Sequence, residues 1–311
     1  MDILVLREGV HGILPSAYAD ELRQRLPGHT VRHAETPEEE RELAASATVI
    51  TGLRIPESVL DRAENLELFA CAYAGTGHLP LDALADADVA VTNAAGVHEP
   101  NAAEHAIGAI LTFSRRFHEA ARADVWQPVS PGELAGSTVS IVGLGAIGEG
   151  IARRLEPFDV RTVGVRRRPE QGGPTDVVLG TNELHRALKR ADFLVLACPL
   201  TESTRGLIGE EELVTLPPDA VVVNIARGEV VDTDALVDAL QSGRIGGAAL
   251  DVTDPEPLPP DHPLWTLDDV VVTPHNAGST PHYYERLSGI LADNVDRLES
   301  GQPLRNRVRL D

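Results

Sequence analysis

The sequence has 311 residues, of which 42% are hydrophobic, and this length and composition are sufficient for two domains with large cores. Its 27 Lys and Arg are outnumbered by 48 Asp and Glu, and the resulting net charge of −21 argues against nucleic acids and anionic membranes as partners. No apolar run reaches the ~20 residues that cross a bilayer, and the opening segment MDILVLREGVHG is not a signal peptide, so we expect a cytoplasmic protein.

The first hundred residues alternate between short apolar runs and amphipathic stretches. The apolar runs predict strands over 2–6, 30–34, 47–53, 66–75 and 89–93. The amphipathic stretches predict helices over 15–26, 37–47 and 56–65. This alternation is typical of an open parallel sheet with right-handed crossovers.

The pattern changes near residue 98, where a long helix over 98–116 is predicted, followed by a loop with Pro and Gly over 126–136. A second alternating series then predicts strands over 138–144, 160–165, 192–199, 220–226, 247–252 and 269–274, and the chain ends in a helix over 281–300. The fold class predicted is therefore α/β, with two doubly wound parallel-sheet domains, Rossmann-like or flavodoxin-like, and a cleft between them. Ligands of such sheets bind outside the carboxyl ends of the strands.

A glycine-rich turn lies between a predicted strand and a predicted helix, in VSIVGLGAIGEGIARRL. Gly143 permits a tight turn, Gly145 lets a pyrophosphate approach the backbone, and Gly148 lets the helix and strand pack closely. The amino terminus of the helix, at Ala146 and Ile147, offers free N–H groups to a phosphate. The motif predicts a dinucleotide site, and the alternative is a tight turn without a ligand.

Three arginines follow the next predicted strand, where an acidic residue would hold the ribose 2′-hydroxyl of NAD. A carboxylate would repel a 2′-phosphate, whereas the guanidinium groups of Arg166 and Arg167 can bind it with paired hydrogen bonds. We therefore expect NADP(H) to be preferred, with NAD(H) as the alternative cofactor. The competing interpretation is that Arg166, Arg167 and Arg168 only decorate a turn or balance an acidic surface.

Charged side chains follow three further strands of this second series. Arg227 lies beyond the strand in VVVNIARGEVVD, Asp251 and Glu256 lie in AALDVTDPEPLP, and His275 lies beyond the strand in VVVTPHNAG. A 2-oxo acid would need such a set. Arg227 can pair with its carboxylate and polarise its keto oxygen, and His275 can protonate that oxygen as hydride arrives from a nicotinamide. A hydrogen bond donated by the imidazole to Glu256 would orient the ring and favour its protonated form.

The segments GLGAIG, NIARGEVVD, ALDVTDPEPLP and TPHNAGST resemble, in order and spacing, the signature segments of D-isomer-specific 2-hydroxyacid dehydrogenases. The resemblance covers nearly the whole chain. It implies that Arg227, Glu256 and His275 are catalytic and that Asp251 lies near the nicotinamide. The arginine at position 166 resembles the NADP-preferring glyoxylate and hydroxypyruvate reductases, which act on small 2-oxo or 2-hydroxy acids.

The resemblance also implies further contacts and an organisation of the chain. The segment CPLTEST resembles the loop that follows the ribose and phosphates of the cofactor, and AYAGTGHLPLD resembles the segment whose amides hold the substrate carboxylate. The family fold implies a substrate-binding domain over 1–99 and 283–311, a dinucleotide-binding domain over 100–282, and a homodimer. The remaining residues assigned to the cofactor are Cys198, Pro199, Thr204, Ala226, Ala277 and Gly278, and those assigned to the substrate are Ala74, Gly75 and Thr76. Independently of the resemblance, Arg54 follows a predicted strand and could give a second contact to the substrate carboxylate.

Several alternatives stay open. The chain could be a cofactor-sensing protein like the corepressors of this family, or an NAD-dependent member that uses phosphoglycerate or phosphite, while Glu256 opposes a formate dehydrogenase. Tyr283 could reach the substrate or only pack its helix. We predict no metal site, because the spacing of His275 and His282 fits no common zinc pattern.

The remaining composition bears on the environment of the protein. Lys189 is the only lysine, and Cys71 and Cys198 lie in apolar strand-like runs, which predicts buried thiols in a reducing cytosol. Molar salt reduces the Debye length to about 3 Å and would screen the repulsion of so many carboxylates. We therefore interpret the acidity as halophilic, and the alternative is an acidic, GC-rich genome bias.

Overall fold

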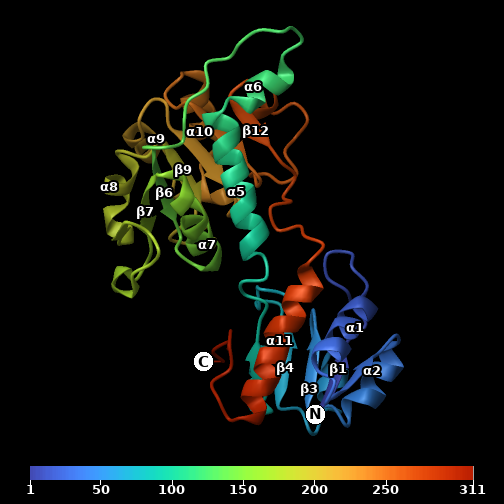
Figure 1. Ribbon diagram of the computed structural model, residues 1–311. Coiled ribbons are helices and arrows are strands. Elements are labelled where there is room, and N and C mark those ends of the chain that lie inside the picture. The colour runs from blue at the N-terminus through green and yellow to red at the C-terminus, as the bar shows by residue number, and fades with distance from the viewer. Residues whose placement is uncertain (311) are drawn as a thin grey trace. The chain divides into compact units, whose positions relative to one another are not determined.

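The computed structural model describes residues 1–310, and the chain divides into two units. Unit 1 comprises Met1–His98 together with the segment that begins at Ser279, and unit 2 comprises Glu99–Gly278. Each unit is a parallel β-sheet with helices on both faces (Figure 1). The predicted α/β class with two doubly wound parallel sheets is thus confirmed.

The sheet of unit 1 has five parallel strands in the order β2-β1-β3-β4-β5, an order found in flavodoxin-like folds. The strands are β1 Asp2–Val5, β2 Thr30–His33, β3 Val49–Gly52, β4 Leu68–Cys71 and β5 Ala90–Thr92. The helices are α1 Pro15–Arg25, α2 Pro37–Ala44, α3 Glu57–Leu60, α4 Leu81–Asp86 and, from the far end of the chain, α11 Tyr283–Glu299.

Alternate residues of these strands supply two separate cores. Ile3 and Val5 face α1 and α11, where Tyr18, Leu22 and Leu287 are buried. Leu4, Ile50 and Phe69 face the other side, against Ala44 of α2, Val59 of α3 and Leu84 of α4. Successive side chains of a strand point to opposite faces, so a strand covered on both sides must be apolar throughout.

The sheet of unit 2 has seven parallel strands in the order β12-β11-β10-β9-β6-β7-β8. The strands are β6 Thr138–Val142, β7 Arg161–Val165, β8 Val177–Leu179, β9 Phe193–Leu196, β10 Val221–Asn224, β11 Gly247–Leu250 and β12 Val270–Val272. The α-helices are α5 Glu99–Ser114, α6 Phe117–Arg122, α7 Ala146–Leu155, α8 Leu184–Leu188, α9 Glu210–Thr215 and α10 Thr233–Gln241. Single 3₁₀ turns occur at η1 Glu156–Phe158, η2 Pro169–Gln171, η3 Thr181–Glu183, η4 Gly228–Val230 and η5 Pro263–Trp265.

The same alternation builds the two cores of unit 2. Val139 and Ile141 pack with α5 and α7, whereas Val142 packs on the opposite face with residues of α8, α9 and α10. The strand order reverses between β6 and β9, which are hydrogen-bonded neighbours although two strands separate them in the chain. Such a reversal is the topological switch point at which doubly wound sheets bind ligands.

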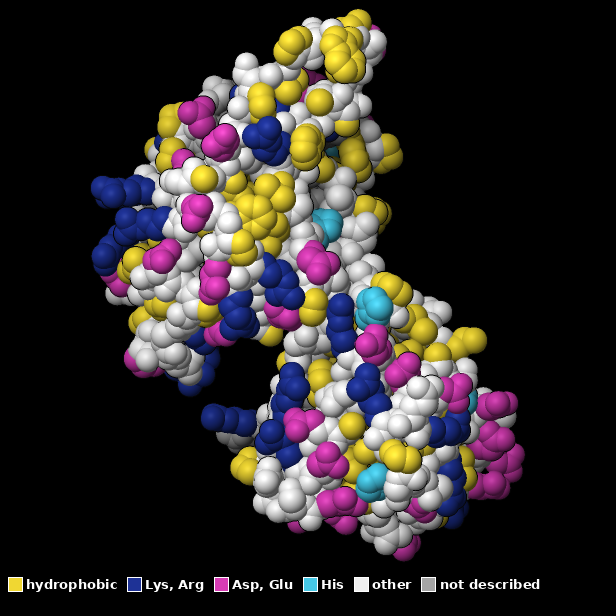
Figure 2. Space-filling model, viewed as in Figure 1, with side chains coloured by type: hydrophobic (Ala, Val, Ile, Leu, Met, Phe, Trp, Pro, Cys, Tyr) yellow, Lys and Arg dark blue, Asp and Glu magenta, His cyan; other side chains and the backbone are white. Residues whose placement is uncertain are grey.

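The predicted elements differ from the observed ones at their ends, and the predictions did not include helices α4, α6, α8, α9 and α10 or the edge strand β8. The run 66–75 predicted a strand, but β4 stops at Cys71 and the rest forms a loop. The edge strand β8 was not predicted, because its three residues follow a segment rich in Gly and Pro that gives no alternating pattern. Lys and Arg side chains gather over α8 near this edge (Figure 2).

Two predictions about apolar segments can be compared with the structure. Within residues 1–310, no helix combines the length and hydropathy that crossing a bilayer requires. Cys71 and Cys198 are both buried and free, as their apolar context predicted. Burial raises the pKa of the Cys198 thiol, so the side chain stays protonated and packs as a small apolar group.

Candidate active site

The glycine-rich turn lies at the switch point, where β6 runs into α7. Gly143 has a φ of 101°, a value that residues with a side chain rarely adopt. A Cβ at Gly143 would also lie 2.6 Å from the backbone nitrogen of Cys198, at the end of the neighbouring strand β9. Both observations require glycine here, so the turn after β6 can pass close to the turn after β9.

The other two glycines of the motif have different surroundings. A Cβ at Gly148 would lie 2.0 Å from the carbonyl oxygen of Gly143, so glycine lets α7 pack tightly on the turn. Around Gly145, the residue that caps α7, no atom lies within 4 Å of such a Cβ. The first N–H groups of a helix have no intrahelical partner, and the open space at Gly145 leaves room for an anion to reach those of Ala146 and Ile147.

The three arginines after β7 do not share one environment. The guanidinium of Arg166 is mostly buried and donates to the carbonyl of Gly172 and, at 2.9 Å, to the side chain of Gln171. Its charge lies 3.4 Å from Glu149 on α7. Arg167 and Arg168 are exposed and have no ion-pair partner among residues 1–310. Arg166 thus closes its own loop, and Arg167 and Arg168 keep uncompensated charges.

The loop after β9 is held by its own hydroxyl groups. Thr204 donates from Oγ1 to the carbonyl of Pro199 at 2.7 Å and accepts at the same distance from the backbone N–H of Thr201. These bonds fix the shape of the segment CPLTEST. Contact of Cys198, Pro199 and Thr204 with a cofactor stays a prediction.

The carboxyl end of β10 positions Arg227. Asn224 is buried, and its side chain accepts from the N–H of Ala226 and donates to the carbonyl of Arg227, both at 3.0 Å. A Cβ at Gly228 would lie 2.0 Å from the backbone of Thr253, so the loops after β10 and β11 touch. The Arg227 side chain is exposed. In the described chain its guanidinium donates only to the carbonyl of the preceding residue, Ala226, and has no carboxylate within ion-pair distance.

His275 and Glu256 come from two neighbouring loops and meet directly. The imidazole Nδ1 lies 2.7 Å from Oε1 of Glu256, and each side chain is 44% exposed. A carboxylate can only accept, so Nδ1 carries the proton, and Nε2 makes no hydrogen bond within residues 1–310. One ring nitrogen of the histidine is therefore fixed by Glu256, and the other has no partner in the described chain.

Asp251 holds the loop that carries His275. Its carboxylate is buried and accepts from the N–H groups of Asn276 at 3.0 Å and Ala277 at 2.9 Å, and from the hydroxyl of Thr273 at 2.6 Å. Its carbonyl accepts the N–H of His275 at 2.8 Å. His275 has a φ of 50°, which these bonds stabilise. Asp251 thus positions the histidine, and its contact with a nicotinamide stays a prediction.

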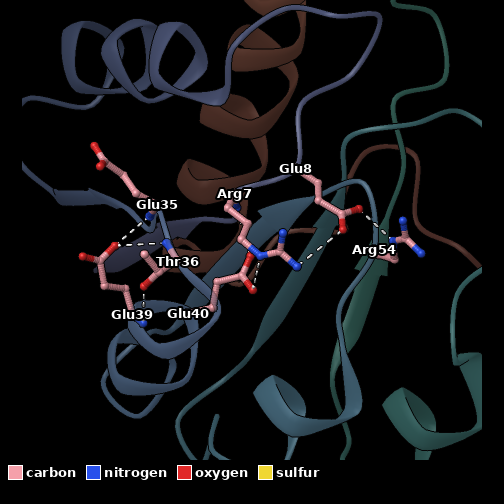
Figure 3. A network of polar contacts seen from close by, with 7 residues as sticks. All are labelled: Arg7, Glu8, Glu35, Thr36, Glu39, Glu40 and Arg54. Carbon is pink, nitrogen blue, oxygen red and sulfur yellow. Dashed lines mark hydrogen bonds and ion pairs between the residues drawn. The ribbon is translucent and has the colours of Figure 1, made fainter.

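In unit 1, the predicted substrate residue Arg54 belongs to a network of charges (Figure 3). Its Nε lies 2.8 Å from Glu8, which lies 3.7 Å from Arg7, and Arg7 lies 3.3 Å from the buried Glu40. Arg7 and Glu8 follow β1, and Arg54 follows β3. The charge of Arg54 is therefore already compensated, although its side chain remains 60% exposed.

The segment 74–76 follows β4, and Ala74 and Gly75 are exposed. The side chain of Asn93 donates to the carbonyl of Ala74 at 2.8 Å, which anchors the loop and leaves its amides unused by that contact. Tyr283 is buried, and its hydroxyl donates to the carbonyl of Ala72 at 2.6 Å. Of the two roles considered for Tyr283, the structure supports helix packing.

The family model described as D-isomer specific 2-hydroxyacid dehydrogenase, NAD binding domain, matches residues 107–277, which is more than half of the chain. The chain belongs to this dehydrogenase family. Its members are oxidoreductases that act on the CH–OH group of 2-hydroxy acids, so the chain is an enzyme that uses a nicotinamide cofactor. The glycine turn and the segments that hold Arg227, Glu256 and His275 all lie inside the matched residues.

Individual relatives carry more specific names. The human glyoxylate reductase/hydroxypyruvate reductase is 37% identical over 269 residues, which are 82% of this chain and 81% of that protein. The D-3-phosphoglycerate dehydrogenase of Methanocaldococcus jannaschii is 32% identical over 88% of this chain, but only 54% of its own length is matched. A D-isomer specific 2-hydroxyacid dehydrogenase structure from Xanthobacter autotrophicus, in complex with NADPH and MES, has a TM-score of 0.79, 30% identity, and coverage of 99% and 98% of the two chains.

Some residues that support the candidate site were not predicted from the sequence. Asn224 shapes the Arg227 turn, and Thr273 bonds Asp251. His105 of α5 lies 3.2 Å from Thr273 and 3.6 Å from Asp251. Asn224 and Thr273 lie inside quoted segments, where a buried polar residue at a strand end is a usable signal. His105 gave no such signal, because it acts over a separation of more than 140 residues.

Proposed function

We propose that this enzyme reduces small 2-oxo acids with NADPH and that His275 donates the proton. The observation that supports this most directly is the His275–Glu256 pair. Nδ1 of His275 lies 2.7 Å from Oε1 of Glu256, and Nε2 has no partner in the described chain. A general acid must present its proton to the substrate and be oriented by a second group. This pair has both properties.

Different residues of the chain have different roles in the proposed reaction. A bound nicotinamide dinucleotide supplies the hydride. Arg227, which has no carboxylate partner in the described chain, binds the substrate carboxylate and polarises the keto oxygen. His275 transfers the proton on Nε2 to that oxygen, and Glu256 stabilises the imidazole in the correct orientation. The amides of Ala74, Gly75 and Thr76, with Arg54, give the substrate carboxylate a second set of donors.

The preference for NADPH rests on the arginines after β7. The strand end carries no carboxylate that would repel a 2′-phosphate, and Arg167 has no partner in the described chain that would compete for its charge. Arg166 shapes the loop through Gln171 and Gly172, and we propose that its guanidinium adds a second contact to the 2′-phosphate. We propose that the turn at Gly143, Gly145 and Gly148, together with Pro199, Thr204, Ala226, Ala277 and Gly278, holds the remainder of the cofactor.

Substitution of Arg167 tests this preference. A charge-assisted hydrogen bond contributes about 1.5–3 kcal/mol, so Arg167→Ala should raise the KM for NADPH by about 10-fold to 100-fold and leave that for NADH nearly unchanged. Arg168→Ala is the matched control, since Arg168 is equally exposed and adjacent. Equal effects on the two cofactors, or a larger effect of the control, would contradict the proposal. Arg166→Asp combined with Arg167→Ala should reverse the preference.

A panel of glyoxylate, hydroxypyruvate, pyruvate and branched 2-oxo acids, assayed with NADPH and NADH in high salt, identifies the substrate. The named similarity to a glyoxylate/hydroxypyruvate reductase makes the first two the expected substrates. The phosphoglycerate relative supports a second candidate, which oxidation of 3-phosphoglycerate with NAD⁺ tests. Absence of turnover with every acid, together with tight cofactor binding, would instead support a cofactor-sensing role.

Two properties of the whole protein belong to this proposal. We expect the enzyme to be a homodimer, and light scattering of the purified chain measures this oligomeric state. We also expect it to lie in the cytoplasm. We also expect activity and melting temperature to rise between low and molar KCl, because screening weakens repulsion among the 48 carboxylates. A flat or falling salt response would favour genome bias as the origin of the acidity.

A further inference from the structure

A second cluster of ligand-type side chains lies at the opposite end of β12 from His275. His118 and Glu119 come from α6, and Asp269 directly precedes β12. One side-chain ligand atom from each residue lies within 4.8 Å of the other two. Nε2 of His118 lies 3.9 Å from Oε1 of Glu119 and 3.8 Å from Oδ1 of Asp269. The catalytic residues proposed above take no part in this cluster.

The histidine of this cluster is buried with one nitrogen unused. The His118 side chain is 4% exposed and stacks on Phe113, with ring centroids 4.4 Å apart. Its Nδ1 lies 3.2 Å from the carbonyl of Thr112, which fixes the proton on Nδ1 and leaves a lone pair on Nε2. That Nε2 atom is buried without a hydrogen-bond partner. An imidazole whose other nitrogen donates to a backbone carbonyl is the arrangement that metal-binding histidines use.

A second unpartnered buried atom lies beside the same space. Ser114 Oγ has no hydrogen bond, and Ser114, His118, Glu119 and Asp269 line one cavity of about 410 Å³. Buried polar atoms are normally satisfied, so two such atoms on one cavity indicate a polar occupant. The cavity also has room for the waters that would complete the coordination of an ion.

The backbone that carries these ligands is fixed. Arg122 at the end of α6 donates to the carbonyls of Asp268 and, at 2.7 Å, Val270, on either side of Asp269. Ligands from two segments more than 140 residues apart are thereby held together. Zinc bonds of about 2.0–2.2 Å place tetrahedral ligands about 3.4 Å apart. Nε2 of His118 lies 3.8 Å from Asp269 and 3.9 Å from Glu119, and all three ligand atoms lie within 4.8 Å of one another, so side-chain rotations of both carboxylates can bring the set to an ion.

From this geometry we propose that His118, Glu119 and Asp269 bind a divalent transition-metal ion such as Zn²⁺ or Mn²⁺. One imidazole and two carboxylates form a mixed nitrogen and oxygen donor set that suits these ions. In the absence of the ion, Glu119 pairs with Arg116, whose side chain is 49% exposed. The ion displaces this guanidinium into solvent and joins α6 to the start of β12.

Titration of the chelator-treated full-length chain with Zn²⁺, followed by calorimetry and thermal melting, tests the site. We expect one equivalent to bind and to raise the melting temperature, and His118→Gln and Asp269→Asn each to weaken binding at least 10-fold. Asp269→Asn alters an exposed side chain, so it keeps the test valid if His118→Gln does not fold. Arg116→Gln should tighten binding, because it removes the cation that competes for Glu119.

His185→Gln is the matched control. His185 lies near Glu211 and Glu212 in a similar but exposed cluster, and both of its ring nitrogens are engaged, with Thr215 at 2.9 Å and Glu212 at 3.3 Å. We expect this variant to bind Zn²⁺ like the unmodified chain. The proposal is overturned if no equivalent binds, if Asp269→Asn binds as tightly as the unmodified chain, or if only His185→Gln loses the ion.

Discussion

Charged side chains at the carboxyl ends of the two sheets differ in whether they are paired with other charges. In unit 1, Arg54 beyond β3 is paired with Glu8 beyond β1, and the pairing continues through Arg7 to Glu40 (Figure 3). In unit 2, Arg227 has no carboxylate partner within residues 1–310, and His275 keeps a free ring nitrogen. In unit 2 the buried Asn224 and Asp251 bond the backbone that carries Arg227 and His275. The guanidinium of Arg227 and Nε2 of His275 have no side-chain partner in the described chain.

This difference teaches how to distinguish candidate site residues from ordinary surface charges. A protein with 48 carboxylates offers many partners to each of its 27 cations. An arginine that stays unpaired in such a protein, on a turn shaped by a buried asparagine, is a stronger candidate for binding an anion than one that is paired. By this criterion Arg227 is the stronger candidate and Arg54 the weaker one.

The largest effect should come from removing the unpaired nitrogen of His275. General acid catalysis contributes about 10²-fold to 10⁴-fold, so His275→Gln should lower kcat by that factor with little change in the KM for the 2-oxo acid. Glu256→Gln should cost about 10-fold to 100-fold, since a charge-assisted hydrogen bond contributes about 1.5–3 kcal/mol. Steady-state kinetics measure both. Activity of His275→Gln within a few-fold of the unmodified enzyme would remove the distinction drawn between the two sheets.

Removing the support beneath the histidine should have the next largest effect. Asp251→Ala removes the acceptor of three donors, of which the N–H of Ala277 is buried and the other two are partly exposed, so we expect a loss of stability of about 1–3 kcal/mol. Hydrogen exchange at the amides of Asn276 and Ala277, together with thermal melting, measures it. Asp254→Ala, an exposed acid in the neighbouring loop, is the control and should change neither quantity. Unchanged protection in Asp251→Ala would mean that the loop is held by other contacts.

A smaller effect is expected from the paired arginine of unit 1. Because Glu8 already compensates Arg54, Arg54→Gln should raise the KM for a small 2-oxo acid by less than about 10-fold. Glu8→Gln should release the guanidinium and lower that KM. A loss for Arg54→Gln as large as that for Arg227→Gln would show that pairing is no guide to function in this enzyme.

The smallest effect concerns Asp176, an exposed residue before β8. The backbone N–H and hydroxyl of Thr162 donate to its carboxylate and hold its pKa below the usual value. The stabilisation is therefore present above the unfolded-state pKa and disappears as the pH falls through the folded-state one. Because the group is exposed, Asp176→Asn should cost well under about 1 kcal/mol near neutral pH. The difference in melting temperature from the unmodified chain should shrink on acidification to about pH 3, and a growing difference would contradict this assignment.

Patterns along the chain predicted much of this architecture. Apolar strands buried on both faces and separated by Gly and Pro predicted the doubly wound class. The glycine turn predicted the helix that begins at Ala146. The edge strand β8 was missed because three residues in a Gly-rich segment carry no periodicity. The compensation of Arg54 by Glu8 was missed because it joins residues 46 positions apart.

The same limit applies to the supports of the candidate site. The charged residues at strand ends could be selected by type and position, but their partners are set by tertiary packing. Nothing near His118 in the sequence indicates Asp269, and nothing near Asp251 indicates His105. Such contacts come from strands and helices that the fold brings together.

The position of α11 has a consequence for how the protein is made. This helix is synthesised after the whole of unit 2, yet Tyr283, Leu287 and Leu291 complete the core that α1 and β1 begin. During translation, unit 1 therefore keeps part of this apolar sheet face uncovered until α11 is made, and unit 2 can become compact first. A chain truncated after residue 278 should therefore contain a folded unit 2 and an aggregation-prone, protease-sensitive segment 1–98.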